Sequence, residues 1–75
     1  MTREVDLSLD EITLGQLLKY ADIVGSGGEV KSFLQETKIL VNGEAENRRG
    51  RKLRAGDVIE IEGFDRLILT KSGRV

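Results

Sequence analysis

One segment decides the fold class, residues 26–43, which read SGGEVKSFLQETKILVNG. Ser26 and Glu29 stand three residues apart, the spacing of a capping box, so a helix is predicted to begin directly after Ser26. Its apolar stripe recurs at helical spacing and is made by Val30, Phe33 and Leu34. The helix is therefore expected to run to about residue 35 or 36 with one face buried.

The second half of this segment changes to the period of a strand. Residues 39–41 would alternate between the two faces of a sheet, and Asn42-Gly43 follows them directly. Asn-Gly is a strong hairpin-turn signal because both residues tolerate a positive φ. Residues 44–46 are then the predicted return strand, which is short and polar.

Upstream of this segment, the chain predicts a strand and another short helix. Residues 4–9 alternate polar and apolar side chains, which is the period of a half-buried strand. Thr13 and Gln16 have the spacing of a capping box, and apolar residues recur at helical spacing behind them. Residues 14–21 are therefore the expected helix, and a corner at residues 22–25 leads to the later helix.

Downstream, the pattern predicts a turn followed by two strands. Residues 55–57 form the turn, in which Asp57 would accept hydrogen bonds from backbone amides. The other expected pieces are a strand at 58–62 with Ile59 and Ile61 inward, a partner strand at 64–69 and a frayed tail at 70–75. These elements define an α+β fold, with two short helices packed on one side of a small twisted antiparallel sheet.

Length and composition limit the function. Seventy-five residues are enough for one domain, 1–75. The chain contains no cysteine and no histidine, which removes disulfides, the usual metal ligands and the usual general base. No catalytic constellation is recognisable, so no enzyme activity, metal or cofactor is expected. The apolar runs are too short to span a membrane and no signal peptide is recognisable, so a cytoplasmic location is predicted.

The net charge of −1 conceals a strongly basic window. Residues 47–54, NRRGRKLR, carry five bases and no acid, whereas residues 1–46 carry four bases and nine acids. One interpretation is a solvated loop that keeps the protein soluble, and the other is a site for a polyanion. Arginine predominates, and its planar fork suits phosphate, which favours the second interpretation.

The candidate site residues come from three parts of the chain. They are Asn47, Arg48, Arg49, Arg51, Lys52 and Arg54 in the basic window, Ser26 and Gly27 at a helix start, and Lys19 and Lys31 on the helices. Helix-start amides favour a phosphate oxygen, although Ser26 is equally interpretable as a plain N-cap and Lys31 as a solubilising lysine. Phe33 and Phe64 are expected in the core, which leaves Tyr20 as the one aromatic for stacking. Folded RNA is therefore favoured over a single strand.

Three motifs together resemble the ribosomal-protein-S-four RNA-binding domain, also called the alpha-L motif. They are Ser26-x-x-x-Val30-Lys31-x-Phe33-Leu34, Val41-Asn42-Gly43 and Leu53-x-x-Gly56-Asp57-x-Ile59. The segments 12–19 and 25–28 are further similar to the small stand-alone bacterial members of the YaaA/YbcJ type. The resemblance covers about residues 12–62. It departs from the family pattern at Gly27, where many members have arginine, and at Thr37, where many have glycine.

The resemblance implies a function and a partner. The partner would be ribosomal RNA or a ribosomal particle. The protein would act as a monomer without a small-molecule cofactor, and it would bind structured RNA through its basic loop and helix pair. Glycine at position 27 lacks the arginine side chain that makes one helix-borne phosphate contact in the family pattern, and the dense basic run at 48–54 is expected to offset this departure. A protein-interaction adaptor, whose basic loop docks on an acidic partner, is the alternative function that the sequence leaves open.

Overall fold

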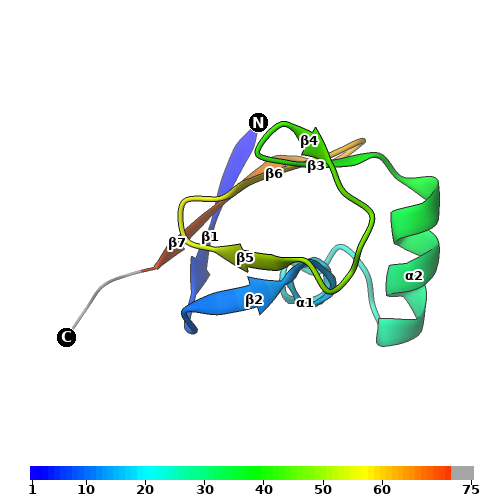
Figure 1. Cartoon of the computed structure of the whole chain (residues 1–75), viewed down its shortest axis with the longest axis horizontal. Helices are drawn as coiled ribbons and strands as arrows, with labels where there is room; N and C mark the ends of the chain where they lie inside the picture. The colour runs from blue at the N-terminus through cyan, green and yellow to red at the C-terminus, as the bar shows by residue number, and fades with distance from the viewer. Residues whose placement is uncertain (72–75) are drawn as a thin grey trace.

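Two helices and a two-stranded sheet cover one side of a five-stranded sheet (Figure 1). The computed structural model describes residues 1–71. The elements in chain order are β1 (Thr2–Leu7), β2 (Glu11–Thr13), α1 (Leu14–Tyr20), α2 (Gly27–Glu36), β3 (Ile39–Val41), β4 (Glu44–Ala45), β5 (Lys52–Arg54), β6 (Val58–Ile61) and β7 (Arg66–Lys71). The predicted α+β class, with two short helices on a small sheet, is confirmed.

The large sheet is mixed, so the prediction of a wholly antiparallel sheet is wrong. Its strand order is β1-β7-β6-β3-β4, and β1 runs parallel to β7, with Thr2 opposite Arg66 and Leu7 opposite Lys71. The other pairs in this sheet are antiparallel. A period of two reports which face of a strand is buried and carries no information about the direction of its neighbour. The chain between β1 and β7 supplies the long crossover that a parallel pair requires.

The small sheet joins two segments whose pairing the sequence pattern does not predict. β2 and β5 are antiparallel, with Ile12 opposite Leu53. Leu53 is fully buried, so the second half of the basic window is a strand anchored in the core rather than a loop. Each of these strands has only three residues, too few for an alternating pattern to be recognised.

The two predicted capping boxes differ in outcome. At α1, Thr13 Oγ1 accepts from the Gln16 amide (3.2 Å) and Gln16 Oε1 accepts from the Thr13 amide (3.0 Å), so this box is confirmed. At α2, the Ser26 hydroxyl caps no backbone amide and instead donates to Glu29 Oε1 at 3.4 Å, so the second box is wrong. Helix α2 therefore depends on its buried apolar stripe, because a short helix is unstable by itself.

The Asn42-Gly43 hairpin is confirmed, and a side-chain network ties it to a second turn. Asn42 has φ 52° and Gly43 has φ 86°, and they connect β3 to β4. The Asn42 amide donates to Asp57 Oδ1 (3.0 Å) and accepts from the Val58 backbone amide (2.9 Å). Asp57 also accepts from the Arg54 backbone amide (2.8 Å), as predicted for the turn after the basic window.

Buried side chains of both helices and both sheets form one hydrophobic core. Ile59 and Ile61 belong to it, as predicted. Phe64 does not, because it is 50 % exposed in the turn between β6 and β7 and packs edge-on against Phe33, with ring centroids 5.8 Å apart. The predicted core position is therefore wrong for Phe64, whereas Phe33 is half-buried against the core.

The strands at the two chain ends are shifted from their predicted positions. The predicted strand at 4–9 lies at 2–7, because pairing with β7 ends at Leu7. Residues 70 and 71 belong to β7 rather than to a tail, and the rest of the predicted tail, 72–75, lies outside the described residues. Within residues 1–71, no helix has the length and apolar character needed to cross a membrane.

Candidate nucleic-acid interface

Backbone hydrogen bonds hold the basic window against the start of α1. The Leu14 amide donates to the Arg51 carbonyl (2.8 Å), and the Gly15 amide donates to the Arg49 carbonyl (2.9 Å). The next amide of the helix is satisfied by the capping box. First-turn amides have no partner within their own helix. Helix α1 therefore uses them to fix the basic loop and does not present them to an external anion.

Gly15 permits this contact because it has no side chain. A Cβ atom at this position would lie 3.3 Å from Arg49 Cβ and 3.3 Å from Val30 Cγ1. Both distances are shorter than ordinary contacts between apolar atoms. Glycine at position 15 thus lets the basic loop, α1 and α2 approach one another closely.

Glu46 organises the loop by accepting five hydrogen bonds. Its Oε2 accepts from the backbone amides of Asn47 (3.1 Å) and Arg48 (3.0 Å). The Arg48 guanidinium makes a two-pronged contact at 3.0 and 3.1 Å, and Arg51 Nη1 donates at 3.0 Å. The Glu46 side chain is only 6 % exposed, because these partners cover it. The polar composition of residues 44–46 is typical of solvent-facing positions, but the Glu46 carboxylate is enclosed by the loop.

These contacts favour the ionised form of the carboxylate. Hydrogen bonds from the side chain and then the backbone of Arg48 lower the pKa of Glu46 from 4.5 to about 2, with a smaller contribution from Arg51, although burial acts in the opposite direction. The same carboxylate raises the pKa of Arg48. Two of the five cations in the basic window are therefore partly neutralised from inside the loop. An acid therefore lies inside the basic surface.

Two further cations of the window lie near an acid on the neighbouring strand. Lys52 Nζ and Arg54 Nη2 each lie 3.8 Å from a Glu11 oxygen, because β2 places Glu11 opposite Arg54. The side chains of Lys52 and Arg54 are 72 % and 77 % exposed. Ion pairs this long and this exposed contribute little energy, so both cations remain available to a ligand.

Arg49 differs from the other four cations, because within residues 1–71 it has no ion-pair partner. It lies between two surface hollows. The first, of about 250 Å³, is also lined by Lys19 and Gly27, and the second, of about 380 Å³, is also lined by Lys31 and Asn47. The structure thus brings together predicted site residues from α1, α2 and the loop. We call this area the Arg49 surface.

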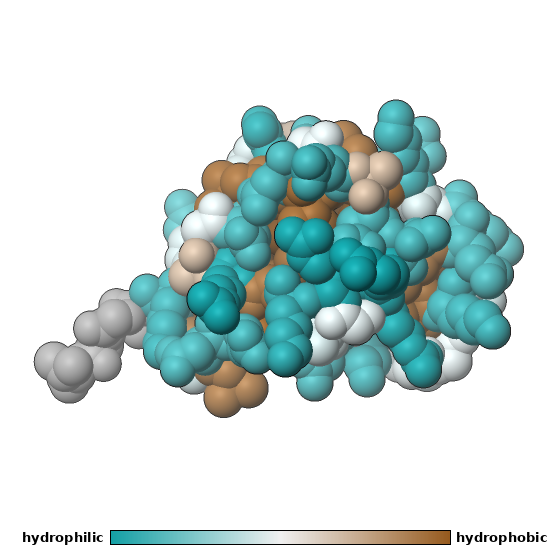
Figure 2. Space-filling model, viewed as in Figure 1, coloured by the Kyte–Doolittle hydropathy of each residue, from teal (hydrophilic) through white to brown (hydrophobic). Residues whose placement is uncertain are grey.

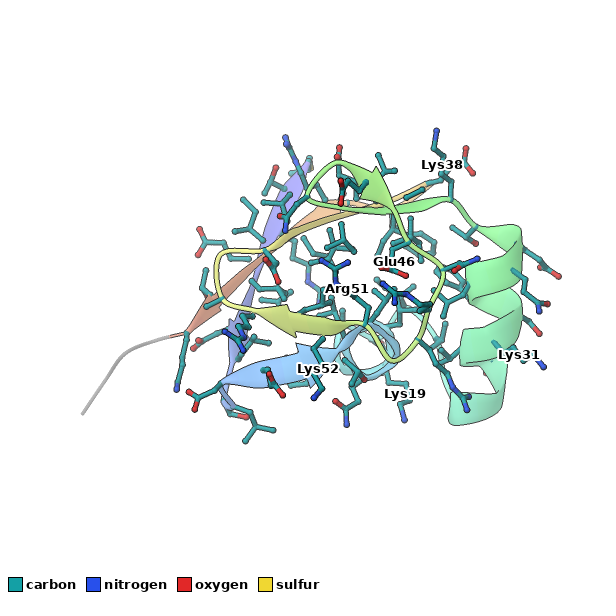
Figure 3. All side chains as sticks on the ribbon, viewed as in Figure 1. Lys19, Lys31, Lys38, Glu46, Arg51 and Lys52 are labelled. Carbon is teal, nitrogen blue, oxygen red and sulfur yellow. The ribbon has the colours of Figure 1, made fainter. Side chains whose placement is uncertain are left out.

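The figures show how the Arg49 surface is arranged. Lys19 and Lys31 project from the two helices on either side of the loop, whereas Glu46 and Arg51 lie within it (Figure 3). Figure 2 shows hydrophilic side chains spread over the loop and β5 on the face toward the viewer. Lys38 projects at the opposite edge of the molecule in Figure 3.

Ser26 is the predicted site residue with the least support from the geometry. Its hydroxyl is directed to Glu29, whose carboxylate lies at the start of α2. A negative charge at this end of a helix takes the place that an anionic ligand would prefer. A phosphate contact at Ser26 stays a prediction.

Three residues that shape the site are absent from the set predicted from the sequence: Gly15, Glu11 and Glu46. Gly15 and Glu11 act through contacts with residues more than thirty positions away, so no local signal points to them. The role of Glu46 could have been predicted, because it stands two residues before Arg48 and five before Arg51, close enough in sequence to form ion pairs within the loop.

Comparison with known proteins identifies the family. The family model described as "S4 domain" matches residues 5–69. The chain therefore belongs to the S4 domain family, which confirms the resemblance seen in the sequence and supports RNA binding at the level of the family. It is 56 % identical over 64 residues to "Probable ribosome maturation protein RlbA" of Bacillus subtilis (strain 168). That alignment covers 85 % of this chain and 90 % of the relative.

Proposed function

We propose that this protein binds structured RNA and that ribosomal RNA within a ribosomal particle is its target. Membership of the S4 domain family supports RNA binding, and the relative's name supports a role in ribosome maturation. The observation that carries the proposal is the Arg49 surface, where an exposed arginine is held between two hollows that each carry a lysine. The proposed activity is binding without catalysis.

The arrangement suits a folded RNA backbone. Lys19 and Lys31 belong to different helices and line different hollows that share Arg49, so the three cations can meet separate phosphates. Folded RNA is recognised largely through phosphates, 2′-hydroxyls and shape, which such a surface matches. The guanidinium of Arg49 adds a planar fork for two-pronged contact with phosphate.

The remaining predicted contacts divide into two groups. Lys52 and Arg54 have side chains more than 70 % exposed and only long ion pairs, so we assign them to the outer part of the RNA contact. The Arg48 side chain is 72 % exposed, but its guanidinium donates two hydrogen bonds to Glu46, so we assign it first to positioning the loop. Arg51 is 34 % exposed and bound to Glu46, so we assign it to positioning the loop rather than to contacting RNA.

The variant Arg49→Ala tests the proposal. Alanine keeps the Cβ atom and the carbonyl that the Gly15 amide binds, so the fold should survive. Each phosphate contact contributes about 0.7–0.9 to the slope of log affinity against log salt. Binding of purified ribosomal RNA by Arg49→Ala should therefore be weaker, with a slope shallower by about one unit.

Matched variants remove the same charge elsewhere. Arg66→Ala, on β7, is the control for Arg49→Ala. Lys31→Ala should weaken binding and flatten the salt slope in the same way, and Lys38→Ala is its control. Equal effects of Arg49→Ala and Arg66→Ala would refute a localised RNA site. If polyglutamate displaced the protein from its cellular partner and ribosomal RNA did not, the adaptor function would replace the proposal.

A further inference from the structure

Another hollow lies beside the Arg49 surface, between the β1–β2 turn and α1. It measures about 270 Å³ and is lined mainly by the apolar groups of Leu7, Leu9, Ile12 and Tyr20. Leu9 is 67 % exposed and Tyr20 is 57 % exposed, so two large apolar side chains open to solvent meet at one place. An apolar hollow with a few polar groups at its edge is the usual form of a small ligand site. We call this hollow the apolar pocket.

The charged and amide groups at the edge of the apolar pocket are hydrogen-bond donors. Ser8, Gln16 and Lys19 complete the edge, where the Ser8 hydroxyl can donate or accept, and none of the described residues that line the pocket is acidic. The Gln16 carbonyl oxygen already accepts from the Thr13 amide at 3.0 Å, whereas its NH₂ group has no hydrogen-bond partner within residues 1–71 and can donate to a ligand. The Lys19 ammonium group also only donates. A fitting occupant therefore has an apolar body, hydrogen-bond acceptors and negative charge.

Tyr20 gives the pocket a fixed aromatic surface. Its hydroxyl donates to the Asp6 carbonyl at 3.0 Å, which ties the end of the side chain to β1 while its base is held in α1. The polar end of the ring is thereby satisfied, and more than half of the side chain stays open to solvent. Stacking on a ring that is already restrained costs little side-chain entropy.

The apolar pocket is continuous with the Arg49 surface, because Gln16 and Lys19 line both hollows. We propose that the pocket receives one unpaired nucleobase of the bound RNA, stacked on Tyr20 with its phosphate toward Lys19 and Arg49. A nucleobase has flat faces for stacking and acceptor atoms on its edges, as the lining requires. The inference rests on the proposed function and narrows the target to RNA that carries an unpaired nucleotide.

The composition of the chain supplies a direct assay. Tyr20 is the single tyrosine and there is no tryptophan, so protein fluorescence reports this one ring. The probes are two synthetic hairpin RNAs whose stems are closed by a polyethylene glycol linker instead of loop nucleotides, one with a single bulged adenosine and the other fully paired. The bulged hairpin should bind about 5- to 150-fold more tightly, the range that stacking of one base supports, and should quench the fluorescence of Tyr20. The variant Tyr20→Leu should lose this preference and keep its affinity for the paired hairpin.

A double variant separates stacking from collisional quenching. Tyr20→Phe combined with Phe64→Tyr moves the single tyrosine to the other aromatic position that is about half exposed. Its fluorescence should not respond to the bulged hairpin, while the preference for that hairpin should remain. Equal quenching of the moved tyrosine would overturn the inference.

The remaining outcomes distinguish the inference from the proposed function. Equal affinity for both hairpins with unquenched Tyr20 would overturn the base pocket alone, and is the result expected if a protein side chain occupies it. Failure of both hairpins and of purified ribosomal RNA to bind would overturn the proposed function. In that case, saturable quenching of Tyr20 by adenosine monophosphate would uphold a nucleobase pocket, and its absence would overturn the inference as well.

Discussion

Replacing Glu46 with glutamine should destabilise the fold and loosen the basic loop. The carboxylate accepts from the guanidinium groups of Arg48 and Arg51, and the amide of a glutamine would turn N–H donors toward these donors. If the interaction were not screened by water, the lowering of the Glu46 pKa from 4.5 to about 2 would correspond to about 3 kcal/mol of unfolding free energy. Because the Arg48 side chain is 72 % exposed, water screens its interaction with Glu46. We therefore expect Glu46→Gln to lower the unfolding free energy by about 1–2 kcal/mol.

The same carboxylate predicts a pH dependence with a definite sign. Its pKa is lower in the folded chain, so its stabilisation is fully present above about pH 4.5 and is lost as the pH falls toward about 2. The difference in unfolding free energy between the wild type and Glu46→Gln should be constant from pH 7 to pH 5 and should shrink at lower pH. Urea unfolding followed by circular dichroism at each pH measures this difference.

Glu44→Gln is the matched control for this experiment. Glu44 is an exposed acid on β4, and it makes no ion pair within residues 1–71. Its replacement should change the unfolding free energy by less than about 0.5 kcal/mol. The reasoning would be refuted if Glu46→Gln were as stable as the wild type at pH 7, or if the two differed by the same amount at pH 7 and pH 3.

Two glycine replacements test the backbone that supports the site. Gly43→Val should cost more than about 1 kcal/mol, because a β-branched residue is strained at φ 86°, and an unchanged melting temperature would contradict the hairpin. Gly15→Val should cost about 1–3 kcal/mol and weaken RNA binding, because its side chain would push Arg49 away from α1. Gly28→Val is the control, because the added Cβ would meet only Ser26 Oγ, at 4.0 Å, and equal losses of unfolding free energy at positions 15 and 28 would argue against the packing explanation.

Elements that depend on neighbouring residues can be predicted from this sequence. The Thr13–Gln16 capping box satisfies backbone amides at the start of α1, and the residues of the Asn42-Gly43 turn tolerate a positive φ. Both effects act within a few positions, so the residue types are sufficient to predict these elements. The second box fails at Ser26, because burial of the apolar stripe holds α2 without it.

The candidate site is predictable in position but not in detail. The charge of residues 47–54 identifies the loop, and charge is a property that can be counted along a chain. The availability of each cation depends on the acids nearby. Glu46 accepts hydrogen bonds from Arg48 and Arg51. Only the folded structure shows that Arg49 lines two hollows.

By itself, the sequence determined the helices, the hairpin, the α+β class and the basic character of one loop, because these follow from local geometry and composition. Tertiary structure decided the parallel pairing of β1 with β7, the pairing of β2 with β5, and the contact of Gly15 with Arg49. Each of these joins residues more than thirty positions apart. Such contacts form only when the whole core is buried, and neither the period nor the charge of a short segment records which distant segment it will meet.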